Sequence, residues 1–221
     1  MVTDTLIQVL FLLLSLGMFL VIHNVPRKAL TKLRLRGREN VQAKRHFVQG
    51  AQLLARARSS RNKNTCVSLA KDAIDQADKA LLLDPRDAAA HILKALSLDL
   101  QGHKSSALRS LDVALSPPAV KTISDRERGD ALFKRAELQI AVNRRRRRVD
   151  SALSDLLESV KLNPGNSKAF CLLGQCYEKK EMRLEAKQAY EEAIRIQPSS
   201  SAAREGLDRS ASNYNGADTK Q

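Results

Sequence analysis

Residues 167–198 read SKAFCLLGQCYEKKEMRLEAKQAYEEAIRIQP. Counting back twelve positions from Pro198 reaches Ala186, and twelve more positions reach Gly174. A small side chain early in each of two consecutive helices allows the helices to pack closely, and a proline cannot continue the second helix. The stretch therefore predicts a helical hairpin that is packed through Gly174 and Ala186 and closed by Pro198.

The same signature recurs twice in the preceding part of the chain. LLLDP ends at Pro85 and VKLNP ends at Pro164, in the way that IRIQP ends the first stretch. Twelve positions before these two prolines stand Ala73 and Ala152. One supersecondary unit that recurs at a period of about 34 residues indicates an array of stacked hairpins.

These residues resemble the tetratricopeptide repeat (TPR) family, in which large, small and aromatic residues hold fixed places before a closing proline. The resemblance covers residues 44–198, and it is fullest over 167–198. In the third hairpin Gln139 departs from the aromatic preference and Ser159 replaces the usual alanine. The residues that hold the family's packing positions are Ala95, Ala107, Ala136, Ala152, Phe170, Gly174, Tyr177, Ala186, Tyr190 and Ala193.

The resemblance implies an all-α fold, a right-handed superhelix of about four TPR hairpins with a C-terminal capping helix. A composition with only 4% aromatic residues and no Trp also favours helices packed through small and aliphatic side chains. We expect a TPR domain at residues 44–210, with repeats at about 44–86, 87–119, 124–165 and 166–198 and the capping helix at 199–210. Ser124 and Glu127 form a capping-box pattern that predicts an early helix start near Asp125. Residues 211–221 are expected to be disordered.

Family members bind an extended peptide or a partner helix in a concave groove, so the resemblance implies such a groove here. Transferred position by position, the groove residues are Ile92, Leu93, Leu96, Asp99, Phe133, Lys134, Glu137, Lys168, Leu172 and Gln175. For the apolar members of this set, packing against a neighbouring hairpin is the favoured alternative role.

One subgroup of the family clamps the acidic C-termini of heat-shock chaperones with three cations and two amides. The register of the first repeat is uncertain by one residue, so its two positions hold Val48 and Gln52, or Phe47 and Ala51. The other matching positions hold Leu93, Asp130 and Lys134, and only Lys134 keeps the required charge. A terminal carboxylate would be poorly paired in such a site, so we do not expect clamp binding of this kind.

Two of the predicted hairpins contain extra residues. Ala136 and Ala152 are sixteen positions apart instead of twelve, and the excess falls at the basic run Arg144, Arg145, Arg146, Arg147 and Arg148. We expect this run at the turn between the two helices of its repeat, or as an extension of their ends. A solvated insertion, a contact with lipid headgroups or an acidic protein, and an RNA contact all remain open for it. In the first hairpin, RSSRNKNT at 58–65 is expected to be a flexible loop.

The N-terminal segment predicts a membrane anchor. Residues 6–22, LIQVLFLLLSLGMFLVI, are apolar apart from Gln8 and Ser15 and would span about 26 Å as a helix, enough for a thin bilayer. A cleaved signal peptide is the alternative, but no basic residue precedes the segment and no small-x-small site follows it. We therefore expect a transmembrane helix at 1–23 and a basic juxtamembrane linker at 24–43.

Charge indicates the orientation of this anchor. Residues 27–63 contain twelve Lys and Arg against Glu39 alone. Because basic flanks stay on the cytosolic side, we expect the TPR domain in the cytosol, at the endoplasmic reticulum or at the outer membrane of mitochondria or plastids. The basic flank is also suited to contact anionic headgroups.

The sequence favours a non-enzymatic function. It contains no glycine-rich phosphate loop and no zinc-ligand spacing, and His23, His46, His91 and His103 are scattered, so we expect no catalytic site, cofactor or metal. The net charge of +14 suits an acidic partner, an anionic membrane or nucleic acid, although few aromatic residues are available for base stacking. We predict a membrane-anchored, cytosol-facing TPR adaptor or receptor that binds a peptide or helix of a partner protein, including an acidic one. The alternative is a basic helical-repeat protein that binds RNA or anionic lipid.

Overall fold

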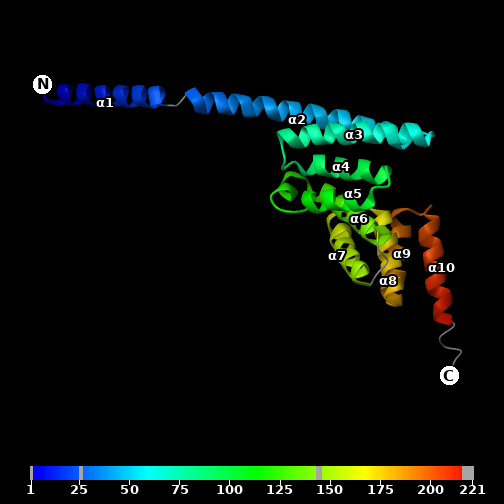
Figure 1. Ribbon diagram of the computed structural model, residues 1–221. Helices are drawn as coiled ribbons and strands as arrows, with labels where there is room; N and C mark the ends of the chain where they lie inside the picture. The colour runs from blue at the N-terminus through cyan, green and yellow to red at the C-terminus, as the bar shows by residue number, and fades with distance from the viewer. Residues whose placement is uncertain (1, 25–26, 143–145, 216–221) are drawn as a thin grey trace.

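The protein is helical throughout the residues that its computed structural model describes (Figure 1). The backbone is described for residues 2–24, 27–142 and 146–215, and the side chains for 5, 7–19, 39–142 and 149–210. No strand occurs in these ranges, which confirms the all-α prediction for them. The helices are α1 Val2–Asn24, α2 Arg27–Ser59, α3 Lys63–Leu83, α4 Ala88–Leu100, α5 Lys104–Ala114, the 3-10 helix η1 Ala119–Thr122, α6 Asp125–Val142, α7 Arg146–Leu162, α8 Ser167–Lys179, α9 Arg183–Ile196 and α10 Ser201–Asn215.

Helices α2 to α9 pair into four consecutive hairpins, α2–α3, α4–α5, α6–α7 and α8–α9, and each hairpin packs on the next. Figure 1 shows the resulting stack, with α10 against its C-terminal end. Alanines at the predicted packing positions of the second helices, Ala73, Ala107, Ala152 and Ala186, are completely buried. Because their side chains are small, paired helices approach closely along their length.

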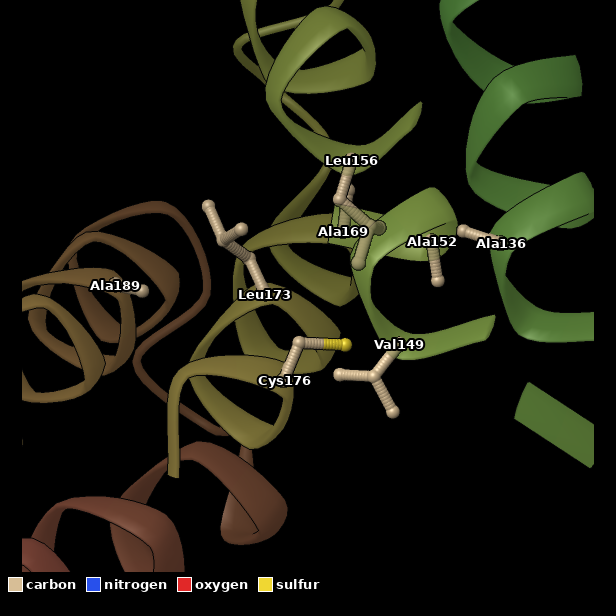
Figure 2. Close-up of a cluster of buried hydrophobic side chains, with 8 residues drawn as sticks. All are labelled: Ala136, Val149, Ala152, Leu156, Ala169, Leu173, Cys176 and Ala189. Atoms are coloured by element: carbon tan, nitrogen blue, oxygen red, sulfur yellow. The ribbon is translucent and has the colours of Figure 1, made fainter. Parts of the chain in front are cut away.

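A continuous apolar core joins the third and fourth hairpins. Figure 2 shows Leu156 and Val149 of α7 beside Leu173 and Cys176 of α8. The same cluster also contains the small residues Ala136, Ala152, Ala169 and Ala189, which come from α6, α7, α8 and α9. Four helices therefore share one core, so the two hairpins stack as a unit.

The fourth hairpin is closed by an aromatic ring held between two glycines. Tyr190 of α9 is completely buried, and its hydroxyl donates a hydrogen bond to Glu178 Oε2 at 2.8 Å. A Cβ atom at Gly174 of α8 would lie 2.7 Å from the ring, and one at Gly206 of α10 would lie 2.4 Å from it. Burial and the Glu178 carboxylate raise the pKa of Tyr190, so the phenol stays protonated.

Helix α10 covers the last hairpin, as the sequence predicts for a capping helix. Ala203 is completely buried, and Leu207 packs beside Tyr190. The helix continues to Asn215, five residues past the predicted boundary at 210, so residues 211–215 are helical where we expected a disordered tail. Residues 216–221 lie outside the described part of the chain.

The first hairpin differs from the sequence prediction. Residues 27–43, expected as a linker, belong to the same helix as the first repeat, because α2 is continuous from Arg27 to Ser59. The loop expected at 58–65 shortens to three residues, since α3 begins at Lys63 with the Asn62 side chain accepting hydrogen bonds from Asn64 N and Thr65 N. The extra residues of this hairpin therefore lengthen its two helices.

Helix α1 is apolar and exposed. Its large apolar side chains are 54–69% exposed, and they are Ile7, Val9, Leu10, Phe11, Leu12, Leu13, Leu14, Leu16, Met18 and Phe19. Within the described residues, no helix has the combined length and hydropathy that crossing a membrane requires. The transmembrane helix predicted at residues 1–23 is not supported by this structure.

The predicted capping box starts helix α6. The Ser124 backbone N–H and hydroxyl donate to Glu127 Oε2 at 2.8 and 2.7 Å, and the Glu127 N–H donates to Ser124 Oγ at 3.3 Å. These hydrogen bonds confirm the box and the early start at Asp125. The hydrogen bonds from the Ser124 hydroxyl and backbone N–H lower the pKa of Glu127.

We predict that Ser124→Ala lowers the free energy of unfolding by about 1 kcal/mol at pH 7, because α6 loses its cap. Since the folded-state pKa of Glu127 is depressed, its contribution is present above the unfolded value of about 4.3 and is lost as pH falls through the folded value. The difference between wild type and variant should therefore shrink near pH 3. Urea unfolding, monitored by circular dichroism at pH 7 and pH 3, measures this difference in the free energy of unfolding.

Ser105→Ala is the matched control, because Ser105 is an exposed residue in the first turn of α5. It should change the free energy of unfolding by less than about 0.5 kcal/mol at either pH. A loss for Ser124→Ala that is equal at pH 7 and pH 3 would contradict the role of the Glu127 carboxylate.

Candidate partner-binding groove

A groove of about 720 Å³ runs along the first helices of the hairpins, α2, α4 and α6, and reaches the start of α8. Its walls combine apolar residues with charged and amide side chains. The lining residues are Phe47, Ala51, Leu54, Ala55, Arg58, Ala89, Ile92, Leu93, Leu96, Ile123, Glu127, Asp130, Ala131, Phe133, Lys134, Glu137, Asn166 and Lys168. The groove therefore joins helices that lie more than a hundred residues apart in the chain.

Most of the groove residues predicted from the sequence lie here. The structure places Ile92, Leu93, Leu96, Phe133, Lys134, Glu137 and Lys168 in the lining. Among the other three, Asp99 lies next to the groove through its ion pair with Lys134, and Leu172 packs against the core of the last two hairpins. Gln175 is half-buried on α8 and is not part of the lining.

The apolar groove residues divide into two groups. Leu54 and Leu93 are 5% and 4% exposed and belong to the core of the first two hairpins. Phe47, Ile92 and Phe133 are half-buried, so part of each side chain faces the groove. The sequence left open whether the apolar groove residues pack against a neighbouring hairpin or line the groove. In the structure some of them are core residues, and others face the groove in part.

The wall formed by α2 was not predicted from the sequence. Phe47, Ala51, Leu54 and Arg58 are spaced by four, three and four positions, which places them on one face of α2. This spacing was the available signal, but the uncertain register of the first repeat hid it. Ile123, Glu127 and Asp130 join the lining because α6 begins early.

The charge of Lys134 is neutralised inside the groove. Its Nζ lies 2.6 Å from Asp99 Oδ2 and 2.6 Å from Glu137 Oε2, and its side chain is 21% exposed. Burial alone would lower the pKa of Lys134, but the hydrogen bonds and charges of the two carboxylates outweigh burial and raise it. Lys134 therefore links α4 to α6 as a protonated amine.

The other groove carboxylates also have partners. Asp130 Oδ1 accepts hydrogen bonds from Asn163 Nδ2 at 2.7 Å and Asn166 Nδ2 at 3.2 Å, and Glu127 is held by the capping box. Arg58 and Lys168 are exposed and make no hydrogen bond or ion pair within the described residues. Among the charged groove side chains, the two that lack a hydrogen-bond or ion-pair partner in the described part of the chain are therefore cations.

The residues predicted for repeat packing are buried or half-buried. The buried members are Ala95, Ala107, Ala136, Ala152, Gly174, Ala186, Tyr190 and Ala193. Phe170 and Tyr177 are half-buried and pack against two core clusters. These residues form the interfaces on which the groove helices rest.

Three residues of the arginine run, Arg146, Arg147 and Arg148, belong to the start of helix α7 in the third hairpin. Helix α6 ends at Val142 and α7 begins at Arg146. Arg144 and Arg145 lie outside the described residues, and so do the side chains of Arg146, Arg147 and Arg148.

The described residues contain no group of three or more His, Cys, Asp or Glu that could hold a metal ion. Of the three cysteines, Cys171 and Cys176 are buried. Burial raises the pKa of the Cys176 thiol to about 11, which leaves it protonated and a poor nucleophile at neutral pH.

Comparison with known proteins supports the TPR assignment. Residues 167–200 match the family model described as "Tetratricopeptide repeat". Among solved structures, the chain resembles MamA protein (TM-score 0.61, 17% identity, 79% of this chain and 83% of that chain) and pilF of Pseudomonas aeruginosa (TM-score 0.61, 18% identity, 80% and 71%). It also resembles YrrB, described as a TPR protein with an unusual peptide-binding site (TM-score 0.55, 19% identity, 67% and 71%).

No sequence among the curated proteins matches the chain. At identities below 20%, the likeness to the solved structures is a likeness of fold. The chain therefore has the stacked-hairpin fold of TPR proteins.

Proposed function

We propose that the protein is a non-enzymatic adaptor that binds a peptide or helix of a partner protein in the groove along α2, α4 and α6. The observation that carries this proposal is the set of half-buried apolar side chains, Phe47, Ile92, Leu96 and Phe133, which meet in one groove from three successive hairpins. Exposed apolar surface in a concave site of this size is typical of a binding site.

Photo-crosslinking tests this proposal with the full chain expressed in cells. A benzophenone amino acid placed at Ala89, in the groove, should crosslink a defined partner, and the same group at Lys79, exposed on α3 outside the groove, should not. Ala51→Trp, which fills the groove, should reduce the Ala89 adduct at least fivefold. Equal crosslinking of the same proteins from both positions would contradict a groove-binding function.

We further propose that residues 6–22 hold the adaptor at a membrane, with the TPR domain on the cytosolic side of the endoplasmic reticulum or of the outer mitochondrial or plastid membrane. Support comes from the apolar sequence of this segment and from the exposure of the side chains Ile7–Phe19 where they are described. The basic residues of 27–63 support the orientation and a contact with anionic headgroups.

Alkaline extraction of cell membranes tests the attachment. The full chain should stay in the membrane pellet, and Leu13→Arg/Leu14→Arg should release it, because each arginine costs about 3 kcal/mol at the centre of a bilayer. The matched control Leu82→Arg/Leu184→Arg replaces two leucines that are 82% and 66% exposed on the stack and should stay in the pellet. Release of the unmodified chain into the alkaline supernatant would contradict membrane attachment.

A further inference from the structure

We propose that the groove selects an acidic, amphipathic segment of its partner, with apolar side chains at its centre and carboxylates at both ends that pair with Arg58 and Lys168. The inference rests on the proposed groove-binding function and adds the chemistry of the partner. It does not use the chaperone clamp positions, of which only Lys134 carries the required charge.

The internal pairing of the groove charges leads to this inference. Glu137 and Asp99 are engaged by Lys134, Asp130 is engaged by two asparagine side chains, and Glu127 is engaged by Ser124. A basic segment would have to compete with these contacts for each carboxylate. An acidic segment meets Arg58 and Lys168, which have no internal partner to lose within the described residues.

The surroundings of the two cations favour a carboxylate. Lys168 lies in the first turn of α8, where the unpaired backbone N–H groups carry a partial positive charge, and Asn166 caps that helix through a bond from Ala169 N at 3.2 Å. The charge of a lysine opposes this partial charge, and a bound carboxylate would offset the repulsion. Arg58, near the end of α2, presents a planar guanidinium that matches a carboxylate in two hydrogen bonds.

The order of residues along the groove defines where the bound segment must carry charged and apolar side chains. Arg58 belongs to the first hairpin and Lys168 to the fourth, while Ile92 and Phe133 come from the hairpins between them. A segment that reaches both cations must therefore cross the apolar surface. This requirement favours a protein segment over a nucleic acid, whose backbone would meet the cations but whose bases would find few aromatic side chains to stack on.

Fluorescence anisotropy with two synthetic peptides tests the proposal on the full chain in a mild non-ionic detergent. Both peptides carry the same central leucines at helical spacing, and one has glutamates at its two ends where the other has glutamines. The glutamate peptide should bind at least tenfold more tightly at low salt, and this preference should shrink at high salt as the ion pairs are screened.

Charge reversal assigns the preference to the two cations. Arg58→Glu/Lys168→Glu should remove the preference for the glutamate peptide and leave the affinity for the glutamine peptide within about twofold. Lys71→Glu/Lys79→Glu makes the same change of net charge on α3, outside the groove, and should keep the preference.

Four results would overturn the inference. If both peptides bind with equal affinity and Ala51→Trp weakens both, the groove binds segments without charge selection, and the proposed function stands alone. If neither peptide binds, or if the double reversal and its control lose affinity equally, Arg58 and Lys168 do not select the ligand. A dimer in sedimentation experiments that the glutamate peptide cannot dissociate would assign the groove to a second copy of the chain.

Discussion

The close approach of helices through alanine and glycine is the constraint on which the rest of this structure depends. Completely buried alanines recur in every hairpin, at Ala73, Ala107, Ala152 and Ala186, and leave no room for a longer side chain at these interfaces. Glycine allows a close contact at Tyr190, whose ring lies between Gly174 and Gly206. Because each hairpin can nest against the next only at this distance, the first helices are aligned side by side, and their longer residues are left to form the walls of a groove.

This alignment brings charged and amide side chains of different hairpins into contact along the groove. Lys134 of α6 reaches Asp99 of α4, and Asn163 and Asn166, near the start of α8, reach Asp130 of α6, so polar contacts across the groove tie three hairpins together. These contacts engage the groove carboxylates in hydrogen bonds and ion pairs and leave the Arg58 and Lys168 side chains as cations with no bond to other described residues. Since α2 runs without a break from Arg27 into the first hairpin, a membrane contact through its basic N-terminal part would also orient the groove.

The third and fourth hairpins could be predicted from sequence because a prolyl end and a small residue twelve positions before it report directly on local packing. The first hairpin carries the same signature at Ala73 and Pro85, but the bounds of its helices could not be predicted. Its extra residues continue α2 and α3, and whether a polar stretch such as RSSRNKNT forms a loop or a helix end depends on tertiary contacts. Gln139, a departure from the family pattern, is explained only by the structure. Its amide donates to Asp155 Oδ2 at 3.1 Å, and Asp155 also binds Arg135, so a polar network replaces the aromatic contact. The α2 wall of the groove was not predicted because the register of the first repeat was uncertain by one residue.

A double-mutant cycle at Gly206 and Tyr190 tests the central claim most directly. With Tyr190 present, Gly206→Ala should lower the free energy of unfolding by about 1–3 kcal/mol, because overpacking exceeds the gain of about 1 kcal/mol in helix propensity. In a Tyr190→Leu background, where the ring is absent, the same change should be neutral or stabilising. Gly165→Ala, whose Cβ atom would lie 3.6 Å from its nearest neighbour, provides the control for the added methyl group. If Gly206→Ala is as stable as the parent while Tyr190 is in place, the hairpins do not depend on the close contact described here.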